Sequence, residues 1–307
     1  MSFLNPISEP VLMYSSTDDQ APKINYAARA AGDIKTVLKA CLVTGYGTKQ
    51  GAGWSIQNET DFAAEFISPS VAMSDYSFGV TDTSTAQTTW YYNFKGVKTT
   101  PAKNNPAKSF YYINASHADN GWRMLITQRG FLFVELVQHP AIGKLSARLT
   151  YFGAIKSGIT DTGGINIAFI NTGHSGLTAD QNFYTRYDYL HIKLESYSNI
   201  RFCTALPRLV SSLNNSSAPS RYDTSISIMD LHSVFYLVTS GGNILLGELP
   251  GLIGKMVNDK TKMFGVSEEV FNGRPVLRVC CGFPDTVAEN VYLYSQVMLL
   301  PLDYWEY

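Results

Sequence analysis

The stretch DIKTVLKACLVTGYGTKQGAGW, Asp33–Trp54, contains both the clearest helix pattern of the sequence and its densest run of glycines. Within residues 27–46 the apolar residues recur at the spacing of one helical face, namely Ile34, Val37, Leu38, Cys41 and Leu42. Asp33 stands at the helix start, where a carboxylate can cap free amide groups. Gly45 or Gly47 stands where a left-handed residue would end the helix. The stretch therefore predicts one amphipathic helix followed by a glycine turn.

The glycine turn, Gly45–Gly53, raises the question of a phosphate-binding loop. In such a loop the glycines lead into a helix N-terminus, where free N–H groups and the positive end of the dipole face the anion. Here the glycines follow the helix, and their spacing fits neither G-x-G-x-x-G nor a P-loop. The segment GLIGKM, Gly251–Met256, fails the P-loop pattern as well. We expect no nucleotide site and no cofactor.

After Trp54 the sequence changes to short apolar or aromatic runs separated by Gly, Asn, Asp and Pro, as in an antiparallel β-protein. Hairpins are expected in Trp122–Gln138, with Gly130 in or beside the turn, and around Gly241–Gly242. Strands are expected near residues 62–67, 88–95, 108–114, 122–128, 130–138, 145–153, 165–171, 188–195, 200–204, 226–229, 233–239, 243–247, 276–283 and 291–300. The predicted fold is mainly β, antiparallel and sandwich- or barrel-like, with one amphipathic N-terminal helix and a minor α+β content.

Residues 1–25 differ in composition from the remainder of the chain. They hold three prolines and the polar run SSTDDQAP, which predicts an extended N-terminal arm reaching onto neighbours, or else a disordered end. The pair Asp18–Asp19 is interpreted as solvated. Residues 26–307 form a β-rich body, and the polar run SLNNSSAPS, residues 212–220, leaves open whether this body divides there.

The charge composition excludes some partners and favours others. The 307 residues include 24 basic and 25 acidic side chains, a formal net charge of −1, so no global field attracts nucleic acid or an anionic membrane. Charged residues are 16% and aromatic residues 13% of the chain. Interface cores are poor in charge and rich in aromatics, so this composition favours assembly. No apolar run is long enough to span a membrane, and the N-terminus lacks signal-peptide features, so we expect synthesis in the cytoplasm and no membrane partner.

The residues that usually carry chemistry are scattered. Cys41, Cys203, Cys280 and Cys281 form no C-x-x-C pair and are interpreted as reduced and structural. The five histidines lack metal-ligand spacing, although the polar loop NTGHSGLTAD around His174 is the one loop that would suit a site. There is no G-x-S-x-G elbow. We predict no metal, no catalytic residues and no enzymatic activity.

Aromatic clusters are the remaining candidates. WYYNF (Trp90–Phe94) and FYYIN (Phe110–Asn114) suit a core, a subunit interface or a platform that stacks on sugar rings. The structural or interface candidates are Gly45, Gly47, Trp54, Trp90, Tyr91, Tyr92, Tyr111, Tyr112 and Trp305.

The segment VLKACLVTGYGTKQGAGW, Val37–Trp54, resembles the N-terminal block hLxACLVxGYGxKxxAGW of a group of uncharacterised virion proteins of tailed bacteriophages. Weaker similarity follows in the same order, in WRMLITQRGFLFVEL, LTYFGAIKSG and GELPGLIGK, and these stretches together cover about a quarter of the chain. Ala154 stands where the group has an acidic residue, and Ile253 replaces an aromatic one.

The resemblance implies a structural component of the phage virion, in the tail, baseplate or collar region, and brings no catalytic residues. We expect a homo-oligomer that docks on other virion proteins. Two alternatives within the particle are a carbohydrate- or receptor-binding module that grips host glycans, and a head decoration or head-completion protein. A hydrolase of cell-wall polymers would need a carboxylate pair or a metal in a cleft, which the sequence does not single out.

Overall fold

The computed structural model describes residues 7–24, 30–83, 88–94, 96–99, 121–138, 145–157, 167–171, 190–193, 231–239, 242–256, 266–280 and 296–307. All strand pairs within these ranges are antiparallel, and they contain a single α-helix. The prediction of a mainly β, antiparallel fold with one N-terminal helix is therefore confirmed.

Helix α1 (Asp33–Lys39) continues as one π-helical turn, η1 (Ala40–Thr44). Its five predicted apolar residues are all fully buried, so the expected face is the one that packs. The predicted cap is wrong, because Asp33 accepts a hydrogen bond from the N–H of Ala30 (2.9 Å), outside the helix. Asp82, which is fully buried, caps the helix by accepting from the N–H of Ile34 (2.9 Å).

Three sheets and one two-stranded ribbon make up the described strands. The central sheet has the order β13 (Leu190–Lys193), β12 (Ile167–Asn171), β10 (Leu145–Ala154), β9 (Gly130–Gln138), β8 (Trp122–Ile126) and β2 (Leu12–Ser15). The five-stranded sheet is a meander of β3 (Ser55–Gln57), β4 (Ala63–Ile67), β5 (Tyr76–Thr81), β6 (Thr89–Phe94) and β7 (Val97–Thr99), with the 3₁₀ turn η2 (Val71–Met73) between β4 and β5.

The C-terminal sheet is built around the long strand β15 (Gly242–Met256). Its order is β11 (Lys156–Ser157), β15, β18 (Gln296–Pro301), β17 (Arg274–Cys280) and β16 (Val266–Phe271), and β14 (Leu231–Thr239) also pairs with β15. The terminal ribbon joins β1 (Ser8–Pro10) to β19 (Tyr304–Glu306).

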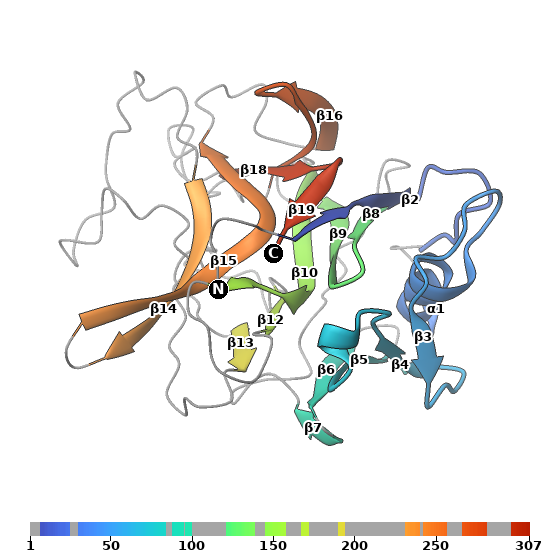
Figure 1. Ribbon diagram of the computed structural model, residues 1–307. Helices are drawn as coiled ribbons and strands as arrows, with labels where there is room; N and C mark the ends of the chain where they lie inside the picture. Colours follow the sequence, from blue (N-terminus) through green and yellow to red (C-terminus); the bar gives the residue numbers. More distant parts are fainter. Residues whose placement is uncertain are drawn as a thin grey trace, which may run out of the picture.

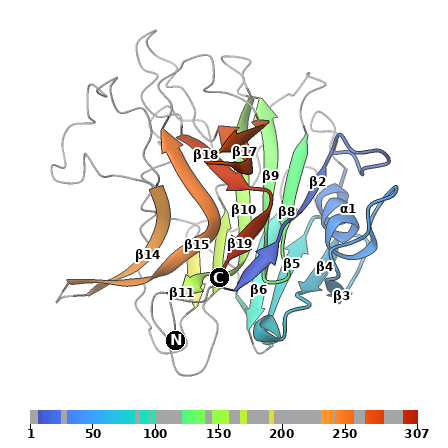
Figure 2. The same cartoon turned by 45° about the horizontal axis from the view of Figure 1, so that its top comes forward.

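The central sheet lies between the C-terminal sheet on one side and helix α1 with the five-stranded sheet on the other (Figures 1 and 2). The burial of strand β9 agrees with this position, because side chains on both of its faces are buried: Phe131 and Phe133 on one face, Leu132 and Val134 on the other. A strand that is covered on both faces reads as a continuous apolar run instead of an alternating one. This layering places β9 in the middle of the molecule.

The main core lies between helix α1, the five-stranded sheet and the central sheet. It is dominated by aromatic rings, namely Trp54, Phe66, Phe78, Trp90, Phe131, Phe133 and Phe152. Phe78 stands at its centre, with ring centroids 5.0 Å from Phe131 and 5.3 Å from Phe152. Such contacts add to the free energy of burying each ring.

The expected N-terminal arm is corrected by the structure for residues 7–24, which we call the N-terminal segment. This segment packs on its own chain: β1 pairs with β19, and β2 forms the edge of the central sheet beside β8. Glu9 in β1 is buried and pairs with Arg129 (2.8 Å), in the turn between β8 and β9. The segment is therefore an integral part of the body.

The hairpin predicted in Trp122–Gln138 is confirmed, with Gly130 starting β9, and β14 and β15 form the second expected hairpin. Sequence reasoning did not identify β1, β2, β3, β5, β7, β11, β16 and β19. The strands expected at 108–114, 200–204 and 226–229, the break at 212–220 and the loop around His174 lie outside the described residues.

Candidate functional site

The glycine turn begins where the helix ends, and its first position, 45, can be occupied only by glycine. Gly45 has φ 77° and ψ 178°, a backbone conformation essentially restricted to glycine, and its N–H donates to the carbonyl of Ala40 (2.8 Å). A Cβ at Gly45 would lie 2.2 Å from the carbonyl oxygen of Lys49. A Cβ at Gly51 would lie 2.2 Å from the carbonyl oxygen of Val43. The turn is therefore folded tightly back on the helix end.

Backbone N–H groups of the glycine turn bond to carbonyl groups of the same chain. Tyr46 and Lys49 exchange two N–H···O bonds (3.0 and 2.9 Å), Ala52 donates to Cys41 (3.0 Å), and Trp54 donates to Leu42 (3.0 Å). The turn also lies at the C-terminal end of the helix, where the dipole is negative. These N–H groups are therefore used to hold the turn against the end of the helix.

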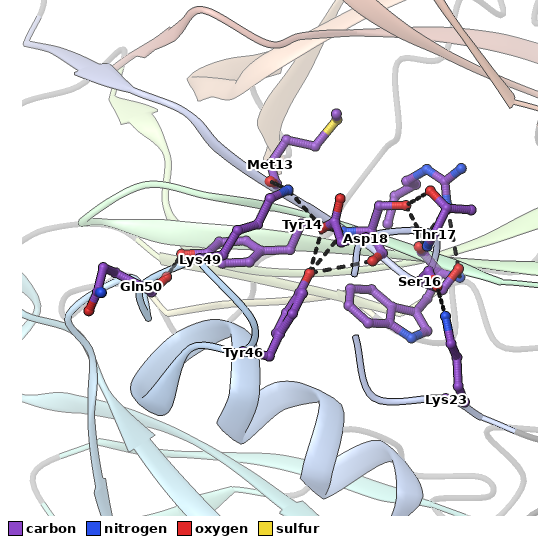
Figure 3. Close-up of polar contacts among 12 residues, drawn as sticks. Met13, Tyr14, Ser16, Thr17, Asp18, Lys23, Tyr46, Lys49 and Gln50 are labelled. Carbon is purple, nitrogen blue, oxygen red and sulfur yellow. Dashed lines mark hydrogen bonds and ion pairs between the residues drawn. The ribbon is translucent and has the colours of Figure 1, made fainter. Parts of the chain in front are cut away.

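Three groups from the turn and from the N-terminal segment converge on Asp18 (Figure 3). The hydroxyl of Tyr46 and the ammonium of Lys49 each lie 2.7 Å from Oδ2 of Asp18, and the N–H of Ser15 donates to the same oxygen (2.8 Å). The interpretation of Asp18 as a solvated residue is therefore wrong. Its carboxylate joins two segments that lie about 30 residues apart in the sequence.

Tyr14, on the neighbouring strand β2, strengthens the same junction. Its hydroxyl donates to the carbonyl of Gln50 (2.7 Å), and its ring meets the ring of Tyr46 edge-on at 6.0 Å. Lys49 also donates to the carbonyl of Met13 (3.0 Å) and lies 5.7 Å from the centre of the Tyr14 ring. We call the group formed by Tyr14, Asp18, Tyr46 and Lys49 the N-terminal clasp.

The protonation states in the clasp suit a structural role. Burial alone would raise the pKa of Asp18, but hydrogen bonds from Lys49, Tyr46 and Ser15 outweigh it and lower that pKa below its usual range. Burial, and secondarily the neighbouring Cys41, raises the pKa of Tyr14 to about 12. Burial and the bond to Asp18 raise the pKa of Tyr46 as well. A carboxyl group whose pKa is lowered and two phenols whose pKa values are raised are poor general acids or bases at pH 7, because their pKa values lie far from 7.

Trp54 closes the glycine turn by anchoring it to the central sheet. Its indole N–H donates to the carbonyl of Thr127 (3.3 Å), at the turn between β8 and β9. Its ring meets Phe131 and Phe152 edge-on at 5.7 and 6.4 Å. The predicted candidate Trp54 is therefore a core anchor that joins helix to sheet. Gly47, with φ 54°, lies against Asp19, where a Cβ would approach the carbonyl oxygen to 2.7 Å.

The aromatic candidates of strand β6 are buried within the protein. Trp90, Tyr91 and Tyr92 are only 3–5% exposed, which leaves no ring face for a sugar or a second subunit. Tyr91 lies over Gly79, where a Cβ would meet its ring at 2.1 Å, and its hydroxyl donates to Glu65 (3.2 Å).

Trp305 is 1% exposed, and its ring occupies the space that a Cβ of Gly251 would need. Tyr111 and Tyr112 lie outside the described residues.

The structure brings together residues that sequence reasoning did not connect. Tyr46 and Lys49 belong to the motif that carries the phage resemblance, so the sequence drew attention to their positions. It did not indicate that both residues contact Asp18. Asp18 and Tyr14 could not be linked to the glycine turn from the sequence, because the contacts that link them to it are with residues 28 to 36 positions away. Within the described part of the chain no group of three or more His, Cys, Asp and Glu could hold a metal ion.

Asp18→Asn is expected to destabilise the protein by about 1–2 kcal/mol at pH 7, because it removes the charge from the hydrogen bonds of Lys49 and Tyr46. The matched control is Asp19→Asn, an exposed neighbour, which we expect to change the free energy of unfolding by less than about 0.5 kcal/mol. Urea unfolding of both variants measures the difference. Equal effects would show that the Asp18 carboxylate contributes nothing specific.

The same variant has a predictable pH dependence. The pKa of Asp18 is lower in the folded state than in the unfolded state, so its stabilisation is present above the unfolded pKa of about 4 and is lost as pH falls through the folded value. The difference in unfolding free energy between wild type and Asp18→Asn should therefore shrink below about pH 4. A difference that stays constant down to pH 2 would contradict this assignment.

No helix in the described part of the chain combines the length and apolarity of a membrane span.

Comparisons with known proteins give no relative from which a role for the clasp can be transferred. No protein-family model, no curated protein and no solved structure matches the chain significantly.

Proposed function

We propose that the chain is a structural protein of a tailed-bacteriophage virion, which assembles with copies of itself and docks on other proteins of the tail, baseplate or collar without catalysis. The proposal rests mainly on one observation: residues of the motif Val37–Trp54 connect separate parts of the fold. Gly45 permits the turn, Tyr46 and Lys49 hold the N-terminal segment, and Trp54 anchors the turn to the central sheet. These residues join parts of the chain, as a mechanical role requires.

The composition and the resemblance support the same role. The chain has few charges and many aromatic residues, which favours a surface that is partly covered by other subunits. The motif is the densest part of the similarity to phage virion proteins. The terminal ribbon adds to this support, because it joins residues 8–10 to residues 304–306, far apart in the sequence.

The two alternatives within the particle are not equally well supported. A glycan-binding module loses its strongest candidates, because Trp90, Tyr91 and Tyr92 are buried. A head decoration or head-completion protein differs from a tail protein in location and copy number, and it would need no other chemistry. The copy number therefore separates the remaining possibilities.

Quantitative peptide mass spectrometry of purified, nuclease-treated particles, calibrated against the major capsid protein, tests the proposal. We expect peptides of this chain at a fixed, low ratio of the kind that a ring or a trimer in the tail region gives. A ratio near one copy per capsid protein would instead favour head decoration. Absence from the particles would reject a virion role.

A further inference from the structure

Strand β16 forms an outer edge of the C-terminal sheet. It pairs with β17 along its whole length, and within the described residues it pairs on that side alone. The two strands are joined by Asn272 and Gly273, whose φ angles of 49° and 77° are those of a two-residue hairpin turn. Figure 1 shows β16 at the periphery of the molecule.

The register decides which backbone groups of β16 face outward. A two-residue turn is closed by a hydrogen-bonded pair, here Phe271 and Arg274, and the pairs alternate from there. Val270 and Pro275 therefore form a non-hydrogen-bonded pair, whose backbone groups point away from each other. The N–H of Leu302 donates to the carbonyl of Pro275 (2.9 Å), on the far side of β17, as this requires. The backbone groups of Val270 and Glu268 consequently point away from the sheet.

Three consecutive side chains of this edge are exposed, and two of them are acidic. Val270 is 75% exposed, and Glu268 and Glu269 are exposed as well. Glu269 is engaged by Arg278, whose Nε lies 2.6 Å from its Oε1. Arg123 is close enough to Glu268 for an electrostatic interaction, but its guanidinium donates to the carbonyl of Trp122 (3.0 Å). Among the described residues, no strand therefore pairs with the outward backbone groups of Glu268 and Val270, which lie beside negative charge.

Charge opposes two of the registers in which a second copy of the same strand could pair with this edge. If two β16 strands paired antiparallel through their outward groups, one of these registers would oppose Glu268 with Glu268, and the other would oppose Glu269 with Glu269. Like charges directly opposite each other on neighbouring strands are destabilising. A strand that carries Lys or Arg at these positions has no such cost.

We propose that β16 is a docking edge, to which an extended basic segment of another virion protein adds as an antiparallel strand. The segment pairs with the backbone groups of Glu268 and Val270, and its Lys or Arg side chains lie beside Glu268. The inference rests on the proposed virion function and names the chemistry of the partner that this function requires.

The test uses phage whose only copy of the gene is a variant, with incorporation measured by peptide mass spectrometry against the major capsid protein. Val270→Pro removes an outward N–H while sparing the pairing with β17, and Val270→Thr is its matched control. Glu268→Lys reverses the charge, and Glu268→Gln is its control. We expect Val270→Pro and Glu268→Lys to lower incorporation by roughly tenfold or more, and both controls to stay within about twofold of wild type.

Each outcome is decisive. Thermal unfolding of the purified variants checks folding, and if Val270→Pro is unfolded, the exposed Glu268→Lys decides alone. Wild-type incorporation of Glu268→Lys and of a folded Val270→Pro would overturn the docking edge while leaving the virion function in place. Loss of the homo-oligomer of the purified chain in Val270→Pro would assign the edge to a second copy and overturn the basic partner. Absence of the wild-type chain from particles would reject the virion function and the docking edge together.

Discussion

Gly45→Ala is expected to destabilise the protein by roughly 4 kcal/mol or more, enough to leave much of it unfolded at 37 °C. Two costs add at this position. The backbone has φ 77° and ψ 178°, which an alanine adopts only with strain, and the new Cβ would lie 2.2 Å from the carbonyl oxygen of Lys49. Neither can relax easily, because the clash is with backbone and Lys49 is held by Asp18.

Two further glycines of the same turn separate these costs. Gly53 has φ 83° but nothing within 4 Å of its Cβ position, so Gly53→Ala measures the backbone strain alone, about 1–2 kcal/mol. Gly51 has no left-handed φ, but its Cβ would lie 2.2 Å from the carbonyl oxygen of Val43, so Gly51→Ala measures the clash. Urea unfolding of the three purified variants gives the comparison.

The order of the three effects is the informative result. We expect Gly45→Ala to cost more than Gly51→Ala, and both to cost more than Gly53→Ala. If Gly45→Ala were no worse than Gly53→Ala, the turn would not be packed against the helix end as described. The N-terminal clasp, which depends on the position of Tyr46 and Lys49, would then also be in doubt.

Local patterns were enough to predict the helix and its glycine turn. The spacing of Ile34, Val37, Leu38, Cys41 and Leu42 is a local property of the chain, and all five residues are buried as expected. The cap could not be found in the same way. Asp82 lies 48 residues after Ile34 and reaches it only because β5 ends beside the helix start, whereas Asp33 was the only local carboxylate.

The clasp and the aromatic residues show the same limit. Tyr46 and Lys49 could be singled out by the motif, but Asp18 is an ordinary acidic residue in a polar, proline-containing stretch, which suits an arm as well as a packed segment. Composition cannot distinguish the two, because the difference lies in pairing with β8 and β19. The burial of Trp90 and Tyr91 likewise depends on residues of the neighbouring strand β5, namely Phe78 and Gly79.

Deletion of residues 1–22 is expected to unfold the protein, whereas a projecting arm could be removed without loss. The deletion removes β1 and β2, and with them the buried Glu9, the partner of Arg129. It also removes Ser16, whose hydroxyl accepts from the backbone N–H of Trp122, and Pro22, whose carbonyl accepts from the indole of the same residue (both 3.1 Å). Circular dichroism and limited proteolysis of the purified product measure the result.

The size of the expected effect follows from the contacts that are lost. Truncating a buried aromatic side chain such as Tyr14 costs about 3–5 kcal/mol, and the loss of Glu9 and of the hydrogen-bond acceptors of Trp122 adds to this cost. Together they approach the total stability of a typical domain, about 5–15 kcal/mol. A cooperative, native-like unfolding transition in the deletion product would contradict the assignment of the N-terminal segment to the body.

A matched pair on β2 distinguishes loss of specific contacts from the general effect of shortening the chain. Tyr14 is 3% exposed and Leu12, two residues earlier, is 45% exposed. We expect Tyr14→Ala to lower the free energy of unfolding by about 3–4 kcal/mol and Leu12→Ala by less than about 1 kcal/mol. Since both variants keep the full chain, a large effect at Tyr14 alone would trace the instability of the deletion to the clasp. Equal, small effects would trace it to the backbone pairing of β1 and β2.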